Sequence, residues 1–311
     1  MMRSESRKFC VIFDQRAQND DGLQQGVQKL QVLGHSVFTK KIDEPREAAR
    51  YAGAAAEQGV DTVVAVGGDG MLNLVVNGIL REKSDVPCSV GLIPFGTGND
   101  FAGASGIPSD SILDALDIVI RVIPVPIDVG QVNETFFVNV ILGGFPAEAA
   151  TETSRKAKAF LGKFAYFVTG LANIGSLDAK DMHFTAPGFE WEGPVYAFGL
   201  GNSRQAGGGF TVSPKAVIDD GMLDLVIIPQ SEAGLVTLVS DYARMNRFDD
   251  TDRIIYRQVP WLILASRETL YLNLDGESIK GKNFRFQVHS RMLPFCLPTN
   301  SPVLIPPSAE G

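Results

Sequence analysis

The sequence contains few of the residues that build disulfide frameworks or zinc sites. Its 311 residues include three cysteines, Cys10, Cys88 and Cys296, and three histidines. An odd number of widely spaced cysteines argues against a disulfide framework and predicts buried thiols in a reducing compartment. The histidines have no partner at metal-ligand spacing, so we do not expect a zinc site.

Long apolar runs and an excess of positive charge are also missing. No run approaches the roughly 20 apolar residues that a transmembrane helix needs. The apolar stretch Phe9–Phe13 stops at Asp14 and is too short for a signal peptide. With 28 basic and 36 acidic residues the net charge is −8, which argues against a nucleic-acid-binding protein. We therefore expect a cytoplasmic protein with no nucleic-acid partner.

The first 120 or so residues alternate between short apolar runs and amphipathic segments, and each such pair is typical of a strand followed by a helix. This order predicts a doubly wound α/β domain with a mainly parallel sheet and helices on both faces. Ligands of such domains bind beyond the carboxyl ends of the strands. The predicted strands are 9–13, 36–40, 62–66 and 90–93, and the predicted helices are 21–33, 45–58, 71–80 and 111–120.

After Pro124 and Pro126 the pattern changes to β-like runs, which predict a β-sandwich. We expect domains at residues 1–126 and 127–290, and a C-terminal segment, 291–311, that can pack back on the first domain. The predicted strands are 127–132, 135–142, 195–200, 223–228, 261–264, 270–274 and 284–289, and two helices are predicted at 157–174 and 231–245.

Two glycine-rich turns follow predicted strands. The first is Gly67-Gly68-Asp69-Gly70 and the second is Gly96-Thr97-Gly98-Asn99-Asp100. Turns without bulky side chains let backbone N–H groups approach a phosphate, and two of them predict a nucleotide cradle. Neither has the spacing of a Walker A loop or a dinucleotide fingerprint. A carboxylate at Asp69 favours a nucleotide bound with Mg²⁺. The alternatives are a tight turn without a ligand and a helix cap at Asn99 or Asp100.

Three further motifs each allow two interpretations. Asp275-Gly276-Glu277 is an ordinary hairpin turn unless the fold returns Glu277 to the cleft. Asp219 and Asp220 are either turn carboxylates or ligands of a hard cation. The basic, aromatic segment 155–167 is either a solvated helix face or a contact with an anionic membrane.

In this order the motifs resemble the diacylglycerol-kinase-like family of bacterial lipid kinases, and most of all its YegS branch, over residues 9–300. The resemblance implies an active site in the cleft between the two domains, with an apolar groove that the lipid would enter. Because we expect no transmembrane span, the protein would reach this lipid from the membrane surface, at the inner face. It implies that Glu277 is the general base, with Asp275 beside it and Asp69 also in the catalytic centre. It implies that the carboxylate of Asp220 and the carbonyls of Val217 and Met222 hold Mg²⁺ or Ca²⁺. ATP would lie on residues of both glycine turns and of the helix after the first, namely Gly67, Gly68, Asp69, Gly70, Met71, Leu72, Asn73, Thr97, Gly98 and Asn99.

Three positions depart from the family pattern. Met71 stands where the family has Thr, Leu74 where it has Glu, and Ile42 aligns with another Thr. Each lost hydrogen bond to the nucleotide would cost about 1 kcal/mol of binding. The first hypothesis is an ATP-dependent kinase that acts on a diacylglycerol-like or phosphatidylglycerol-like lipid. The alternatives are a lipid- or nucleotide-binding protein without kinase activity, and a relative of NAD kinases, which share the Gly-Gly-Asp-Gly loop.

Overall fold

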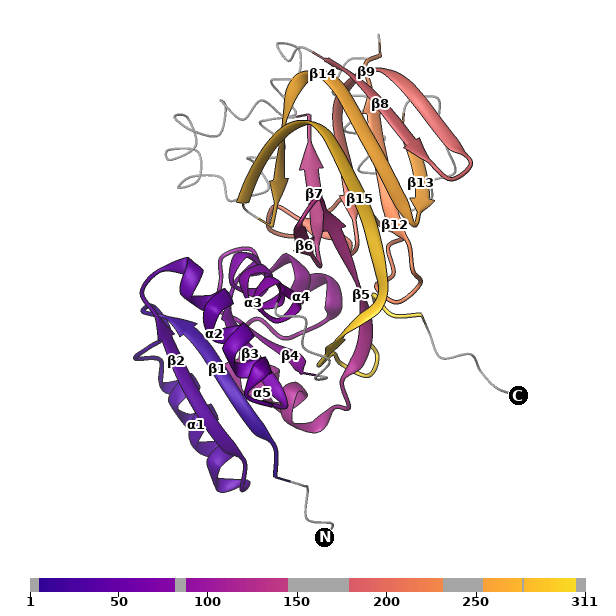
Figure 1. Ribbon diagram of the computed structural model, residues 1–311. Coiled ribbons are helices and arrows are strands. Elements are labelled where there is room, and N and C mark those ends of the chain that lie inside the picture. The colour runs from indigo at the N-terminus through magenta and orange to yellow at the C-terminus, as the bar shows by residue number, and fades with distance from the viewer. Residues whose placement is uncertain (1–5, 82–87, 145–178, 232–253, 276, 306–311) are drawn as a thin grey trace, which may run out of the picture.

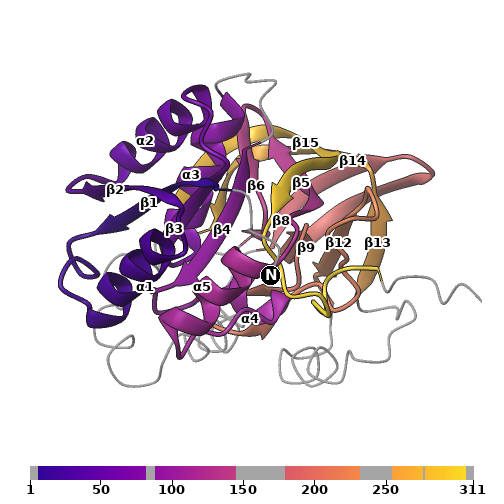
Figure 2. The same cartoon turned by 90° about the horizontal axis from the view of Figure 1, so that it is seen from below.

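The computed structural model describes residues 6–81, 88–144, 179–231, 254–275 and 277–305. The N-terminal half is a parallel sheet in the order β2-β1-β3-β4 with helices on both faces. Helices α2 and α3 pack together on one face, and α1 and α5 pack together on the other (Figure 2). The predicted doubly wound domain is therefore confirmed. Its elements are β1 (Lys8–Asp14), α1 (Asp21–Val32), β2 (Ser36–Ile42), α2 (Pro45–Glu57), β3 (Thr62–Gly67), α3 (Asp69–Arg81), β4 (Ser89–Pro94), α4 (Asp100–Ser105) and α5 (Ile112–Arg121).

The central strands β3 and β4 are buried along their whole length, as apolar strands covered by helices on both faces should be. Helix starts are set by local capping. The side chain of Asp20 accepts the backbone N–H of Leu23 at the start of α1, and Pro45 opens α2. Cys10, Cys88 and Cys296 are free, buried thiols, as predicted.

The C-terminal half is an antiparallel β structure around a second core that contains Phe184, Phe198 and Phe286. The predicted β-sandwich is therefore confirmed. In Figure 1 it lies above the helical half. Its strands are β5 (Val125–Val132), β6 (Thr135–Phe137), β7 (Val140–Gly143), β8 (Lys180–Ala186), β9 (Phe189–Gly201), β10 (Gln205–Ala206), β11 (Phe210–Thr211), β12 (Leu223–Pro229), β13 (Ile255–Val259), β14 (Trp261–Leu274) and β15 (Glu277–Phe295).

Several predicted strand bounds in this half are wrong. The runs 261–264 and 270–274 form one strand, β14, because its pairing with β15 continues across an irregularity between Ala265 and Leu270. The run 284–289 is part of the 19-residue strand β15. The run 135–142 is two strands, β6 and β7. The predicted helix 157–174 lies outside the described residues, as does the predicted helix 231–245 apart from Ser231.

Strand β15 joins the two halves. Its last residue, Phe295, pairs in parallel with Val90 of β4, and the N–H of Cys296 donates to the Val90 carbonyl at 2.8 Å. Further along, the hydroxyl of Ser301 donates to the carbonyl of Ser105 in α4. The sheets of the two halves are therefore continuous through β15 and β4 (Figure 1). Among the described helices, none combines the length and the apolar character needed to cross a bilayer.

Candidate active site

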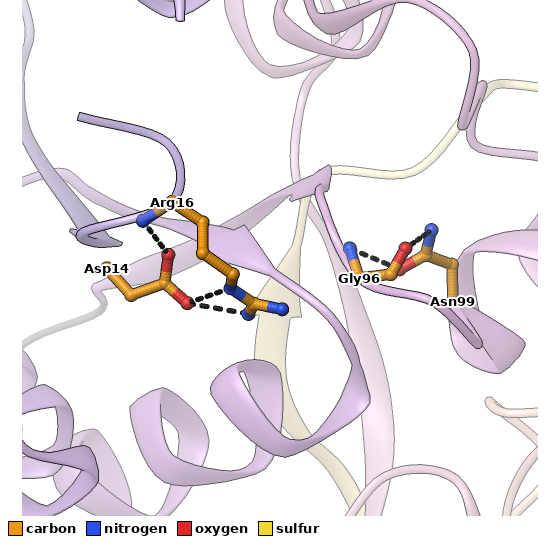
Figure 3. A network of polar contacts seen from close by, with 4 residues as sticks. All are labelled: Asp14, Arg16, Gly96 and Asn99. Carbon is orange, nitrogen blue, oxygen red and sulfur yellow. Dashed lines mark hydrogen bonds and ion pairs between the residues drawn. The ribbon is translucent and has the colours of Figure 1, made fainter. Parts of the chain in front are cut away.

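The two glycine turns contact each other at the carboxyl ends of β3 and β4. A side-chain carbon added at Gly96 would lie only 2.4 Å from the Cα of Gly68, so the backbones are in direct contact. The side chain of Asn99, which has a φ of 55°, holds the second turn closed. Its Oδ1 accepts the N–H of Gly96 at 3.0 Å, and its Nδ2 donates to the Gly96 carbonyl at 3.1 Å (Figure 3).

The carboxylate of Asp69 caps the start of α4. Its Oδ2 accepts the N–H of Asp100 at 3.1 Å, and its Oδ1 accepts the N–H of Phe101 at 2.9 Å. Asn99, one of the two alternatives, does occupy the N-cap position, but its side chain makes no capping hydrogen bond because its amide is bound to Gly96. Asp69 therefore ties the first glycine turn to the helix that follows the second. Thr97 lies exposed within the second glycine turn.

Asp100 connects this cluster to the C-terminal half. Its Oδ1 accepts the backbone N–H groups of Gly208 and Gly209 at 2.7 and 2.5 Å. Sequence reasoning treated Asp100 as a capping residue and missed this role. Gly208 and Gly209 lie more than 100 residues further along the chain, so no local pattern in the sequence indicates this contact.

The Asp275 turn reaches the first glycine motif. The hairpin that joins β14 to β15 pairs Leu274 with Glu277, and the Oδ2 of Asp275 accepts the amide of Asn73 in α3 at 2.9 Å. A side-chain carbon at Gly70 would lie 3.7 Å from the carbonyl of Asp275. The segment is thus a hairpin turn that also packs against α3. The side chain of Glu277 lies outside the described residues.

A buried amide network supports this contact. The side chain of Asn77, one turn along α3, accepts the N–H of Phe136 at 3.0 Å and donates to the Phe136 carbonyl at 2.8 Å. Its Nδ2 also donates to the Oδ1 of Asn73 at 3.0 Å. The network fixes Asn73 in the rotamer that binds Asp275. The sequence offered one signal for Asn77, since it and Asn73 are two polar residues one turn apart in a mainly apolar helix.

Burial raises the pKa of the Asp275 carboxyl from 3.8 to about 8, and the nearby charges of Asp69 and Asp100 add to the shift. Hydrogen bonds from Asn73 and from the backbone of Val140 oppose it. The protonated form of Asp275 is therefore favoured at neutral pH. A cation close to Asp69 and Asp275 would reverse this preference, since it stabilises the ionised form.

The three departures from the family pattern place apolar side chains in or against the first hydrophobic core. Ile42 is buried at the end of β2 in the first core. Met71 and Leu74 are half-buried on α3 and pack against the same core. A side-chain carbon at Gly67 would lie 2.6 Å from the Cβ of Met71. The Leu72 side chain is buried, so Leu72 can offer a ligand only its backbone.

Arg16 is a charged residue at the same sheet edge that sequence reasoning overlooked. It follows the end of β1, whose residue Phe13 pairs with Val66 just before the first glycine turn. Asp14 orients it, because Oδ2 of Asp14 accepts Nε and Nη2 of Arg16 at 2.8 and 2.6 Å (Figure 3). The sequence did contain a signal for Arg16, because polar residues that directly follow a buried strand lie at the carboxyl edge of the sheet.

The predicted cation loop, with Val217, Asp220 and Met222, lies elsewhere. Its residues 218 and 219 bond to the C-terminal segment at 303–305 rather than to the glycine turns. The N–H of Gly221 donates to the buried Asp128 at 2.6 Å, and the N–H of Met222 donates to Oδ1 of Asp220 at 2.9 Å. Sequence reasoning missed Asp128, a charged residue within a buried strand.

The chemistry of this loop fits a hard cation. Burial raises the pKa of Asp220, and repulsion from Asp128 and Asp219 adds to the shift. A cation would relieve this repulsion, and carboxylate and carbonyl oxygens are the ligands of Mg²⁺ and Ca²⁺. Within the described residues, however, no three His, Cys, Asp or Glu side chains cluster closely enough to hold a metal by themselves. The assignment of Val217, Asp220 and Met222 stays a prediction.

Comparison with known proteins assigns both halves of the chain. The family model of the diacylglycerol kinase catalytic domain matches residues 8–132. The model of the YegS C-terminal NAD kinase beta sandwich-like domain matches residues 139–297.

Curated relatives match over nearly the full length. Proteins named "Probable lipid kinase YegS-like" include one from Pseudomonas aeruginosa, 36% identical over 308 residues and covering 98% of this chain and 99% of the relative. Another, from Xanthomonas campestris, is 36% identical over 300 residues and covers 94% of this chain and 97% of the relative.

Solved structures agree on the fold. The crystal structure of a diacylglycerol kinase from Bacillus anthracis aligns with a TM-score of 0.75 at 20% identity, covering 96% of this chain and 99% of that chain. A further Bacillus anthracis chain aligns with a TM-score of 0.80 at 22% identity and the same coverage. The chain therefore belongs to the YegS-like branch of the diacylglycerol kinase family, and it is a phosphotransferase of the lipid kinase class.

Proposed function

We propose that this lipid kinase transfers the γ-phosphate of ATP to a hydroxyl group of a diacylglycerol-like or phosphatidylglycerol-like membrane lipid. The observation that carries the proposal is the contact between Asp275 and Asn73. It brings the turn that precedes Glu277 to the helix that starts at the first glycine turn, so residues of both halves meet at one place.

The nucleotide phosphates would lie on the touching turns at Gly68 and Gly96. Lipid kinases in general use ATP with a divalent metal, and the charge of Asp69 suits Mg²⁺ bound with a nucleotide. Asp69 already accepts two backbone N–H groups, so a metal would use its remaining lone pairs. The exposed guanidinium of Arg16 could bind a phosphate group at this edge of the sheet. The apolar side chains of Met71 and Leu74 have no group that could do so.

The acceptor hydroxyl would approach from the side of the β14–β15 turn. Phosphoryl transfer needs positioning and charge neutralisation more than covalent chemistry. Glu277, two residues after Asp275, would orient the hydroxyl and take its proton. Asp275 is held by Asn73, and Mg²⁺ at Asp69 would favour its ionised form. The second cation, Mg²⁺ or Ca²⁺ at Val217, Asp220 and Met222, would stabilise the loop around Asp128. It would take no part in phosphoryl transfer.

Transfer of radiolabelled γ-phosphate from ATP to extracted bacterial lipids, with Mg²⁺, tests the proposal. We expect a labelled lipid with the wild type and none with Glu277→Ala, while the control Glu268→Ala, an exposed carboxylate on the same hairpin, keeps full activity. Equal labelling by Glu277→Ala would remove Glu277 from the mechanism. The absence of any labelled lipid from folded wild-type protein would refute the proposed function.

We also propose that the protein acts in the cytoplasm, at the inner face of the membrane, where such a lipid is reached. The predicted membrane contact at residues 155–167 lies outside the described residues and stays a prediction.

A further inference from the structure

Three large apolar side chains are exposed on β14, two before the irregularity between Ala265 and Leu270 and one after it. Trp261, Ile263 and Tyr271 are 37%, 43% and 44% exposed, although they alternate with residues buried in the second core, such as Leu262 and Leu272. Side chains on a strand alternate between the two faces of a sheet. The three residues therefore share the outward face of the β14–β15 hairpin.

Strand β15 sets cations opposite these side chains. Lys280 pairs with Tyr271, and Arg285 pairs with Ile263. Directly opposed side chains in an antiparallel pair lie about 5 Å apart at their Cβ atoms. Lys282 is exposed between the two cations. The same arrangement, an exposed apolar side chain beside a cation, thus occurs twice along the hairpin.

These cations have no acidic partner among the described side chains. In the part of the chain that the structure describes, no carboxylate forms an ion pair with Lys280, Lys282 or Arg285. The exposed Glu268 of β14 forms an ion pair with Lys180 of β8. The exposed Glu190 and Glu192 lie on β9, which β8 and β14 separate from β15. The face therefore carries local positive charge although the whole chain has a net charge of −8.

An anionic bilayer is the surface that matches this combination. Trp and Tyr rings favour the boundary between lipid headgroups and acyl chains, and lysine and arginine are attracted to anionic headgroups. Figure 1 shows β14 and β15 on the viewer's side of the upper half, with the labelled helices all in the lower half. The same two strands end in the turn at Asp275, so the face and the candidate active site belong to one hairpin.

We propose that the outward face of the β14–β15 hairpin docks the enzyme on an anionic lipid bilayer. The proposal rests on the proposed function, because it gives the site access to a membrane-embedded substrate. Lys280, Lys282 and Arg285 supply the attraction, and Trp261, Ile263 and Tyr271 enter the headgroup region.

Vesicle co-sedimentation tests the docking. The full-length wild type is mixed with vesicles of phosphatidylcholine alone, or of phosphatidylcholine with phosphatidylserine, an anionic lipid that is not a proposed substrate. We expect binding to the anionic vesicles only, and binding about 25-fold weaker for the double variant Lys280→Ala/Arg285→Ala, since each cation contributes about fivefold. Trp261→Ser should weaken binding as well. The control Lys40→Ala/Lys41→Ala, which removes two exposed cations from β2 in the other half, should bind as the wild type does.

Activity on two substrate forms separates this proposal from the proposed function. The docking variants should lose turnover on diacylglycerol in anionic vesicles but keep it on a dispersed short-chain diacylglycerol. Wild-type levels of vesicle binding by these variants would overturn the docking, whatever the kinase assay shows. A dimer that Trp261→Ser dissociates, without vesicle binding by the wild type, would assign the face to a second copy and also overturn it. Vesicle binding that needs Lys280 and Arg285, without transfer to any lipid, would support the docking and refute the proposed function.

Discussion

Replacing Asp275 by asparagine removes a carboxyl group whose pKa is raised from 3.8 to about 8, mainly by burial. Asparagine keeps an oxygen that can accept the amide of Asn73, so the main hydrogen bond survives. The folded state holds the Asp275 proton to a higher pH than the unfolded state does. As the pH rises from about 4 towards about 8, the unfolded state therefore loses this proton first, and the wild type loses stability.

The size of the effect follows from the pKa shift. When the folded state binds one proton more than the unfolded state, each pH unit of increase lowers the free energy of unfolding by about 1.36 kcal/mol. Over about 4 pH units the loss is at most about 5 kcal/mol. The asparagine amide does not titrate, so the stability of the Asp275→Asn variant relative to the wild type should increase steadily as the pH rises.

Urea unfolding at a series of pH values, with a chelator present, measures this difference. A chelator is needed because a divalent cation near Asp69 would favour the ionised carboxylate. The exposed carboxyl of Asp181 provides a control, and Asp181→Asn should follow the pH dependence of the wild type. Wild-type and Asp275→Asn curves that stay parallel between about pH 5 and about pH 8 would show that Asp275 is ionised, and would refute the reasoning.

Three further predictions concern the same site. Gly96→Ala should reduce kinase activity strongly while the protein still folds, because the added carbon must push the turn away from Gly68; wild-type kcat/KM would contradict the contact. Asp100→Ala leaves the N–H groups of the Gly208 turn without their acceptor and should cost about 1–3 kcal/mol of stability, measured by urea unfolding; an unchanged midpoint would argue against this link. Met71→Thr should tighten ATP binding about fivefold in calorimetry, since one hydrogen bond is worth about 1 kcal/mol; unchanged affinity would mean that position 71 does not contact the nucleotide.

Much of the fold follows from local sequence patterns. The runs at 62–66 and 90–93 are mainly apolar and each leads into a glycine-rich turn, so they predict buried parallel strands with turns at one sheet edge. The contact between Gly68 and Gly96 confirms that the two turns meet there. The motif at Asp275 was less certain, because an Asp-Gly pair predicts a hairpin equally well. The structure shows that it is a hairpin turn and also contacts α3.

Other features depend on contacts between distant residues, which local patterns do not report. Asp100 looks like a helix cap, yet its carboxylate binds Gly208 and Gly209 in the other half. The break at 265–269 looks like the end of a strand because polar residues interrupt the alternation, yet β14 pairs with β15 on both sides of it, up to Ala265 and again from Leu270. Asp128 accepts backbone N–H groups from Gly221 and Arg291, and both partners lie far along the chain.

The most direct test of the central claim offers the purified enzyme, ATP with labelled γ-phosphate and Mg²⁺ three separate acceptors: diacylglycerol in mixed micelles, phosphatidylglycerol in mixed micelles, and NAD. The account predicts a labelled lipid with at least one of the two lipid acceptors, and no labelled NADP. Label in NADP alone would assign the site to a dinucleotide kinase. No labelled product from any acceptor, with the protein folded, would contradict the account as a whole.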